Sequence, residues 1–275
     1  MIVAGIQMDI AWEDPQENFR RVEETTARVM EDGVGAGEEH SAPDLIVLPE
    51  MFATGFSMDG EKVAGFAGIT REFLSNLASR RSVSVLGGYA EPDSPLPANA
   101  CSIFGPTGQE MLHYRKLHPF ALAKEHEHFM AGESVATAEV AGVRVTPFIC
   151  YDLRFPEPFR PAASDTDLFC VIANWPDKRR AAWSALLRSR AIENQAYVLG
   201  VNRVGHASGM EHAGDSALVD PMGEVLSDVD EYQEGIAGGT VDPREVRKVR
   251  RTLGFLKDRR PELYLRLEGE RDVRT

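Results

Sequence analysis

Cysteine is scarce in this sequence of 275 residues, which contains only Cys101, Cys150 and Cys170. The number is odd, the three residues are far apart, and none belongs to a C-x-x-C pair. The sequence therefore predicts neither a disulfide framework nor a zinc cage. We expect reduced thiols and no metal or other cofactor.

A long apolar run and an excess of basic residues are also missing. No run reaches the length of a membrane span, and residues 1–7 lack the basic segment and cleavage site of a signal peptide, so we expect a cytoplasmic protein. The 30 Lys and Arg against 43 Asp and Glu give a formal net charge of -13. This charge disfavours binding to nucleic acid or to an anionic membrane. A small-molecule partner fits the composition better.

Apolar runs typical of strands alternate with stretches of helical composition, which is the pattern of a layered α/β protein. A loop is expected over residues 33–42. Because no linker rich in Ser or Gly divides the chain, we expect a single domain over residues 1–275, ending in a C-terminal helix and arm at 242–275. Strands are predicted over residues 2–8, 45–48, 83–86, 99–104, 111–114, 143–149, 168–173, 196–201, 216–219 and 224–226, and helices over 17–30, 70–81, 181–194 and from 242.

Cys150 carries the strongest local signal, because it stands where an apolar strand gives way to a polar segment expected to open a helix. A thiol at a helix N-terminus gains from the helix dipole and from unpaired backbone N–H groups, which lower its pKa and can hold an oxyanion. The alternative is a small apolar residue of the core. Cys101 and Cys170 fit that alternative, since both lie within apolar strands.

Two charged residues also follow predicted strands. Glu50 comes directly after the strand at 45–48, where it would face the sheet edge from which Cys150 projects. Lys116 follows the second strand of the hairpin that ends at Tyr114. Lys116 alone would be interpreted as a surface lysine. A nucleophilic thiol needs a base, however, and a partly desolvated carboxylate can serve.

Together, three motifs resemble the signatures of the nitrilase or carbon-nitrogen hydrolase superfamily, in the family's order. They are Leu-Pro-Glu ending at Glu50, Tyr-Arg-Lys-x-His around Lys116, and Cys-Tyr-Asp-x-Arg-Phe-Pro beginning at Cys150. The resemblance extends from Ile6-Gln7 to the late hairpin. It implies a four-layer αββα sandwich, with two mixed sheets flanked by helices, and a Glu-Lys-Cys catalytic triad.

The resemblance also implies roles. Glu50 would accept the thiol proton, deliver it to the departing amine and then activate water against a thioester. Lys116 and the backbone N–H of Tyr151 would stabilise the oxyanion. The family often has a second glutamate, for which spacing favours Glu125, with Glu127 as the alternative. His126 and His128 could suggest a metal, but no third ligand accompanies them, so no metal site is expected.

Finer matches at residues 51–58, 125–132, 173–176 and 190–197 look like the bacterial omega-amidase branch, which deamidates 2-oxoglutaramate and 2-oxosuccinamate. Such substrates are short, flat and anionic, so their carboxylate requires a cation. Arg154 and Arg203 are the candidates by position, although Arg154 could equally be a structural partner of Asp152. The remaining substrate-binding candidates are the aromatic residues that could wall the pocket, together with an amide: Phe52, Phe120, Tyr151, Trp175 and Asn174.

Nitriles are disfavoured as substrates, because true nitrilases carry Cys-Trp-Glu where this chain has Cys150-Tyr151-Asp152. N-carbamoyl amino acids, linear ureas and aliphatic amides remain alternatives. So does a catalytically inactive binding protein of the same fold. The resemblance further implies a homodimer that pairs through Arg160, Trp183 and the stretch after Asp242.

Overall fold

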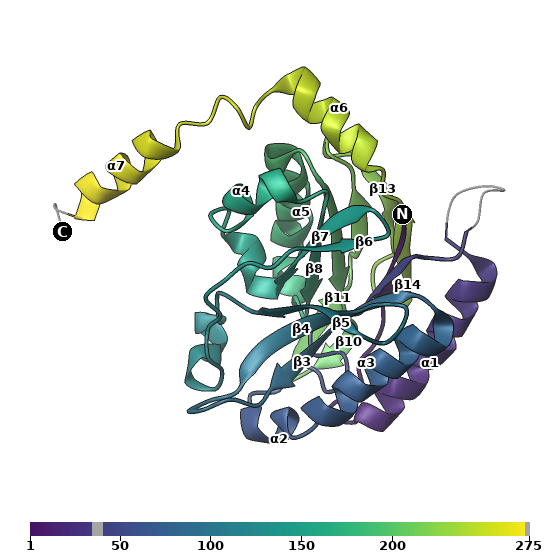
Figure 1. The fold of residues 1–275 in the computed structure, drawn as a ribbon. Helices are drawn as coiled ribbons and strands as arrows, with labels where there is room; N and C mark the ends of the chain where they lie inside the picture. The colour runs from purple at the N-terminus through teal and green to yellow at the C-terminus, as the bar shows by residue number, and fades with distance from the viewer. Residues whose placement is uncertain (35–40, 273–275) are drawn as a thin grey trace.

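The structure, a computed structural model, describes residues 1–34 and 41–272. Most of the loop expected at 33–42 therefore lies outside the described residues. Two six-stranded mixed sheets lie at the centre of the molecule (Figure 1). The first has the order β14-β1-β2-β3-β4-β5, and within it β1, β2 and β3 are parallel while the other neighbours are antiparallel. Its strands are β1 (Ile2–Gln7), β2 (Leu45–Val47), β3 (Ser84–Glu91), β4 (Ala98–Phe104), β5 (Glu110–Arg115) and β14 (Gly235–Thr240).

The second sheet repeats this arrangement, with the order β13-β12-β9-β8-β7-β6. Its central strands β7, β8 and β9 are parallel, and the outer pairs are antiparallel. A separate two-stranded hairpin, β10 (Val204–Ala207) and β11 (Met210–Ala213), follows β9. The strands of the second sheet are β6 (Ala138–Val140), β7 (Val143–Ile149), β8 (Leu168–Ala173), β9 (Tyr197–Asn202), β12 (Ala217–Val219) and β13 (Val225–Asp228).

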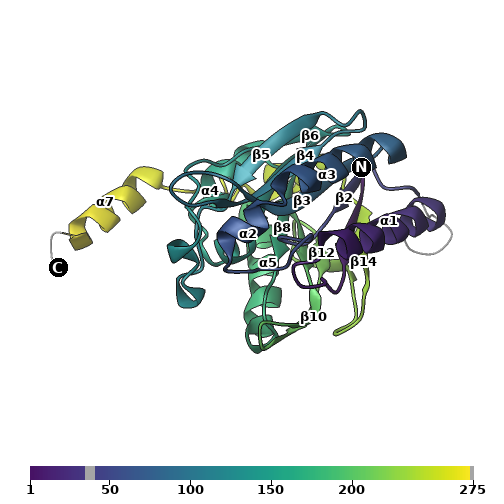
Figure 2. The same ribbon diagram turned by 90° about the horizontal axis from the view of Figure 1, so that it is seen from below.

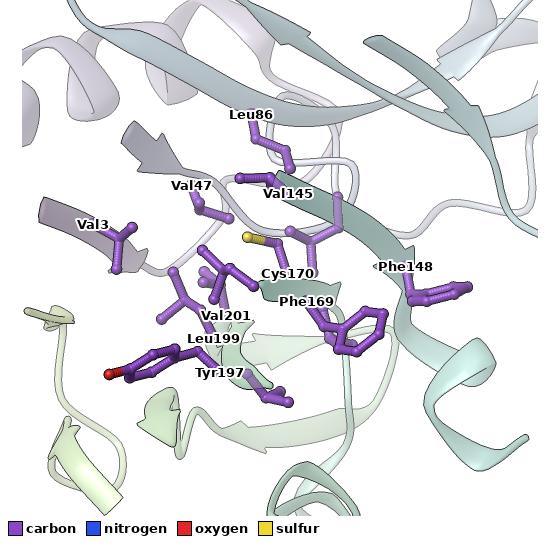
Figure 3. Packing of buried hydrophobic residues seen from close by; sticks show 14 of the residues in the cluster. Val3, Val47, Leu86, Val145, Phe148, Phe169, Cys170, Tyr197, Leu199 and Val201 are labelled. Carbon is purple, nitrogen blue, oxygen red and sulfur yellow. The ribbon is translucent and has the colours of Figure 1, made fainter. Parts of the chain in front are cut away.

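The two sheets pack face to face through side chains that alternate along each strand. Val3, Val47 and Leu86 of the first sheet meet residues of the second sheet such as Cys170 and Leu199 (Figure 3). Because successive side chains on a strand point to opposite faces, the intervening residues of the first sheet face away from the second. The expected sandwich of two mixed sheets is confirmed, and its interior is a continuous apolar core.

Helices cover the outer faces of the sandwich. On the first sheet, α1 (Pro15–Asp32) and α3 (Ala67–Arg81) lie over the outer face (Figure 2). They contribute Phe19 and Leu74 to an apolar cluster with Ile46 and Val85. On the second sheet, α5 (Arg180–Asn194) contributes residues that include Trp183 to the core. Two short helices, α2 (Gly60–Ala64) and α4 (Phe159–Ala162), connect neighbouring segments. None of the helices at residues 1–34 and 41–272 combines the length and apolar content needed to cross a membrane.

The C-terminal part forms α6 (Pro243–Leu253) and α7 (Pro261–Asp272), and α7 lies apart from the body in both views (Figures 1 and 2). The sequence predicted the first of these helices but described the rest as an arm without clear periodicity. Helix α2, strands β6 and β14 and the β10–β11 hairpin were also not predicted. Trp183 is fully buried, and its indole N–H donates to the carbonyl of Asp215 over 2.8 Å. It therefore offers no surface to a second subunit, contrary to the expectation.

Candidate active site

Four segments bring polar residues to one edge of the sandwich. Glu50 follows β2 and Lys116 follows β5 in the first sheet, while Cys150 follows β7 and Asn174 follows β8 in the second. Asn174 joins the two sheets, because its backbone N–H donates to Glu50 Oε2 over 2.8 Å and its side-chain amide donates to the Glu50 carbonyl over 2.6 Å. The edge of the two packed sheets thus becomes a single polar site.

Lys116 lies between two carboxylates, and all three side chains are withdrawn from solvent. Its Nζ donates to Glu50 Oε1 over 3.0 Å and to Glu125 Oε2 over 2.8 Å. The Asn99 amide lies within hydrogen-bond distance of the same two carboxylates, at 2.8 Å from Glu50 and 2.9 Å from Glu125. A buried ion pair requires such additional hydrogen bonds to offset its desolvation. Asn99 had no distinguishing motif in the sequence and was not predicted.

The structure distinguishes the two candidates for the supporting glutamate. Glu125 is buried, contacts Lys116, and accepts a hydrogen bond from the backbone N–H of Phe120 over 2.5 Å. Glu127 is about half exposed and pairs at 3.3 Å with Lys124 on the surface. Only Glu125 is therefore placed to act on Lys116.

The buried charged groups shift one another's pKa values. Burial alone would lower the pKa of Lys116, but Glu125, Glu50 and Cys150 outweigh it and raise the pKa of the ammonium above its ordinary value. Burial and the neighbouring Glu50 raise the pKa of Glu125, and the nearby Lys116 opposes that shift. Lys116 consequently remains a cation at any physiological pH.

Cys150 occupies a strained turn in place of the helix N-terminus that the sequence suggested. Its φ is 47°, a left-handed conformation that is costly for a residue other than glycine. The residues after it form only a 3-10 turn, η3 (Cys150–Arg154). Strain of this kind is often found at functional positions, where it fixes the direction of one side chain.

The predicted lowering of the Cys150 pKa is wrong. Withdrawal from bulk water raises the pKa of the thiol well above its ordinary value, and the negative charge of Glu50 raises it further. Lys116 and the backbone N–H of Asn174 oppose this shift. A single 3-10 turn supplies too little dipole to compensate. These shifts favour the neutral thiol in the resting protein.

Asp152 holds the turn at Cys150 in place through hydrogen bonds. It is completely buried and accepts hydrogen bonds from Ile149 N–H at 3.0 Å, His118 N–H at 2.9 Å and the Tyr114 hydroxyl at 2.7 Å. Its Oδ1 also lies 2.8 Å from His118 Nδ1. The sequence placed Asp152 in the cysteine motif but assigned it no such function.

A pocket opens onto Cys150. Five of its fifteen lining residues are Phe, Tyr or Trp, as expected for a site that binds a small flat molecule. Of the predicted substrate-binding residues, Phe120, Tyr151, Arg154, Asn174 and Trp175 line it. The other lining residues were not predicted: Trp12, Phe56, Ala123, Pro176, Arg179, Ala207, Ser208, Met210 and His212.

Two predicted substrate-binding residues lie elsewhere. Phe52 is fully buried between the first sheet and its helices, 6.1 Å from each of the rings of Phe19 and Phe73. Arg203 is also fully buried, where it pairs with Asp9 at 2.5 Å and donates to the carbonyl of Val204. Both are structural residues, and of the two arginines proposed for the carboxylate only Arg154 lines the pocket.

No group of three or more His, Cys, Asp and Glu side chains that could hold a metal ion occurs within residues 1–34 and 41–272. The charged groups around Cys150 are instead paired with one another through hydrogen bonds. A thiol, a carboxylate and an ammonium in one site are the groups that nucleophilic attack by sulfur requires.

Comparisons with known proteins agree with this geometry. The chain matches the model of the carbon-nitrogen hydrolase family over residues 2–251. It is 36% identical to Omega-amidase YafV of Escherichia coli (strain K12) over 229 residues, which cover 83% of this chain and 84% of that protein. It is 32% identical to the 2-oxoglutaramate amidase of Bacillus subtilis (strain 168) over 266 residues, 95% of this chain and 98% of that protein.

The fold also has solved counterparts. XC1258 from Xanthomonas campestris, a CN-hydrolase superfamily protein with an arsenic adduct in its active site, superposes with a TM-score of 0.84 at 30% identity. The superposition covers 94% of this chain and 97% of that one. The similarity therefore extends over both sheets and their helices.

Proposed function

From the premise that the chain belongs to the carbon-nitrogen hydrolase family and hydrolyses carbon-nitrogen bonds other than peptide bonds, we propose that it deamidates a short ω-amide of a 2-oxo dicarboxylic acid, such as 2-oxoglutaramate or 2-oxosuccinamate. The observation that carries the proposal is the burial of Lys116 between Glu50 and Glu125 beside the Cys150 thiol. Relatives named omega-amidase and 2-oxoglutaramate amidase support the substrate class.

In the first half-reaction, Glu50 removes the proton from Cys150 as the sulfur attacks the amide carbon. Lys116 and Asn99 both donate to Glu50 Oε1. Oε2 accepts from the Asn174 backbone N–H at 2.8 Å and has only a long contact of 3.5 Å with the Asn174 amide, so this oxygen can still accept the proton. The carbonyl oxygen becomes an oxyanion, held by Lys116 Nζ and the backbone N–H of Tyr151. Glu50 then gives the proton to the nitrogen, and the C–N bond breaks. Ammonia departs, and the acyl group remains on Cys150 as a thioester.

In the second half-reaction, Glu50 takes a proton from water as the oxygen attacks the thioester. The tetrahedral intermediate uses the same two donors, and its collapse breaks the C–S bond and returns the proton to sulfur. Loss of a single oxyanion donor typically raises such a barrier by about 3–4 kcal/mol. Glu125 holds Lys116 in place and charged throughout. Arg154, whose guanidinium lies 4.8 Å from the Trp175 ring in the pocket, is available to the substrate carboxylate.

Ammonia release tests the proposal. The wild type is assayed with 2-oxoglutaramate, glutamine, a nitrile and an N-carbamoyl amino acid, in parallel with Cys150→Ala. We expect 2-oxoglutaramate to be the preferred substrate and Cys150→Ala to be inactive. A mass increase corresponding to an acyl group on Cys150 during turnover would support the thioester. Full activity of Cys150→Ala would refute the covalent route, and preference for the carbamoyl compound would refute the substrate class.

We also propose that the protein is a homodimer that uses the stretch after Asp242. Helix α7 lies apart from the body, and Tyr264, Leu265 and Leu267 on it are 44%, 69% and 48% exposed. A group of exposed apolar side chains of this kind is a candidate surface for contact with another protein. Light scattering on the full chain tests this, and a mass of 30.3 kDa, that of one chain, would contradict it.

A further inference from the structure

The pocket is cationic although the chain carries a net charge of -13. Among the described residues that line it there is no aspartate or glutamate, while two arginines are present, Arg154 and Arg179. The third basic lining residue is His212. Burial and the charge of Arg203 lower its pKa to about 4, so it is neutral at physiological pH. Any attraction of an anion into this pocket must therefore come from the two guanidinium groups.

Arg179 is held in position by its backbone, and its guanidinium lies over an aromatic ring. It ends the 3-10 turn η5 (Asp177–Arg179), and its carbonyl accepts a hydrogen bond from the Trp175 indole over 2.9 Å. Its guanidinium lies 5.0 Å from the centre of the Phe120 ring. Stacking on an aromatic ring occupies the face of a guanidinium and leaves the N–H groups at its edge available to a ligand.

The adjacent arginine behaves differently. Arg180 is turned into ion pairs with Asp215, at 2.7 Å, and Glu231. The nearby Asp177 accepts a hydrogen bond from the Tyr232 hydroxyl at 2.9 Å. Arg179 makes no ion pair with any carboxylate in the described part of the chain. In a protein with more acidic than basic residues, an arginine of the pocket wall that is left without a carboxylate is a candidate for binding one from outside.

We propose that Arg179 determines specificity by binding the carboxylate of the substrate in the pocket that Cys150 and Arg154 also line. The inference rests on the proposed function insofar as the substrate is an anionic amide. A guanidinium binds a carboxylate with two parallel hydrogen bonds, which a lysine or a neutral donor cannot reproduce. Arg179 thereby takes the place that sequence position alone suggested for Arg203.

The kinetic test compares two amides that differ only in charge. 2-Oxoglutaramate carries the carboxylate, and 4-oxopentanamide has a methyl group in its place. For Arg179→Gln, we expect kcat/KM for 2-oxoglutaramate to fall about 10- to 100-fold, mostly through KM, while the value for 4-oxopentanamide stays within about twofold of the wild type. Arg179→Lys should restore only part of the loss.

Lys178→Gln is the matched control, because it removes the same charge one residue away from an exposed side chain outside the pocket lining. It should leave both amides unaffected. Equal losses for the two amides in Arg179→Gln, or equal losses of 2-oxoglutaramate turnover in the two glutamine variants, would overturn the proposal. The first result would indicate a structural role, and the second a long-range effect of charge.

A binding measurement separates this inference from the proposed reaction. Calorimetry measures 2-oxoglutaramate binding to Cys150→Ala, which cannot form the thioester, and to the double variants with Arg179→Gln or Lys178→Gln. We expect only Arg179→Gln to weaken binding, by about 10- to 100-fold. Absence of binding to Cys150→Ala, or binding unchanged by Arg179→Gln, overturns the role of Arg179. If Arg179-dependent binding is found without ammonia release by the wild type, the reaction fails and the anion site stands.

Discussion

The Asp152 carboxylate accepts a hydrogen bond from the backbone N–H of His118 over 2.9 Å, although 34 residues separate the two. The same carboxylate accepts from Ile149 N–H, directly before the nucleophile. His118 lies two residues after Lys116, and Ile149 one residue before Cys150. Asp152 thus ties the segment that carries the ammonium to the turn that carries the sulfur, and it sets their relative position without touching the substrate.

We predict that Asp152→Asn lowers kcat more than it changes KM. An asparagine has one acceptor oxygen and an NH₂ group that would face buried donors, and an unsatisfied buried donor costs about 1–3 kcal/mol. The free energy of unfolding, measured in urea, should fall by a similar amount. Tyr114→Phe removes only one of the hydrogen bonds and should give a smaller loss of kcat. Wild-type kcat in Asp152→Asn, despite reduced stability, would show that Asp152 is structural only.

Lys116→Met should abolish ammonia release and destabilise the fold. It leaves Glu50 and Glu125 buried without their shared cation, and breaking a buried ion pair typically costs about 3–5 kcal/mol. Lys124→Met is the control, because Lys124 is 70% exposed and pairs with Glu127 at the surface. The change at Lys124 should cost no more than about 1 kcal/mol. Comparable losses in the two variants would contradict the central position given to Lys116.

The triad candidates could be predicted because each of them stands in a short sequence motif that resembles a motif of the family. Glu50 and Cys150 follow apolar strands, whose ends can be recognised locally. Lys116 follows the mixed strand β5 and is singled out only by the motif around it. Phe52 shows where this reasoning stops. It lies only two residues after Glu50, but Met51 adopts a φ of 46°, and the chain turns Phe52 into the core between sheet and helices. Local sequence does not reveal such a change of direction.

The pocket walls depended on contacts between distant segments. Arg203 follows a strand as expected, but its partner Asp9 is 194 residues away and draws it into the interior. Trp12 and Met210 reach the pocket from the start of the chain and from the unpredicted β10–β11 hairpin. The direction of such side chains depends on tertiary packing, for which the strand and helix pattern holds no information.

The stability of the protein should depend on His212 in mildly acidic solution. Burial and the charge of Arg203 lower the pKa of His212 from 6.5 to about 4. Since the folded pKa is depressed, the unfolded chain binds the extra proton first, and the associated stability is present above pH 6.5 and lost as the pH falls toward 4. The loss should reach up to about 3 kcal/mol.

Urea unfolding of the wild type and of His212→Gln, measured between pH 4 and pH 7, tests this. The wild type should lose stability steadily below pH 6.5, and the variant should show a flatter profile because it has no imidazole to protonate. Exposed His126→Gln provides the control for removal of a histidine as such. Parallel profiles for the wild type and His212→Gln would show that the buried imidazole does not govern the acid sensitivity.

The last prediction concerns the opposite effects of Glu50 and Lys116 on the pKa of the Cys150 thiol. Glu50 raises the pKa of the thiol and Lys116 lowers it, in addition to the upward shift from burial. Glu50→Gln should therefore lower the thiol pKa and make alkylation by iodoacetamide faster at a given pH, while ammonia release is lost because the base is gone. Lys116→Met should slow alkylation. Mass spectrometry can follow the reaction at Cys150 alone, since Cys101 and Cys170 are fully buried.

The combination of faster alkylation with lost turnover separates two mechanisms. If Cys150 were a preformed thiolate stabilised by Lys116, Glu50→Gln would leave its reactivity toward iodoacetamide largely unchanged. The alternative is that Glu50 is the base that removes the proton during attack, which agrees with the raised thiol pKa. In that case Glu50→Gln reacts faster with iodoacetamide but no longer forms the thioester. Slower alkylation in Glu50→Gln would contradict the electrostatic assignment, and a burst of ammonia from that variant would show that another base accepts the proton.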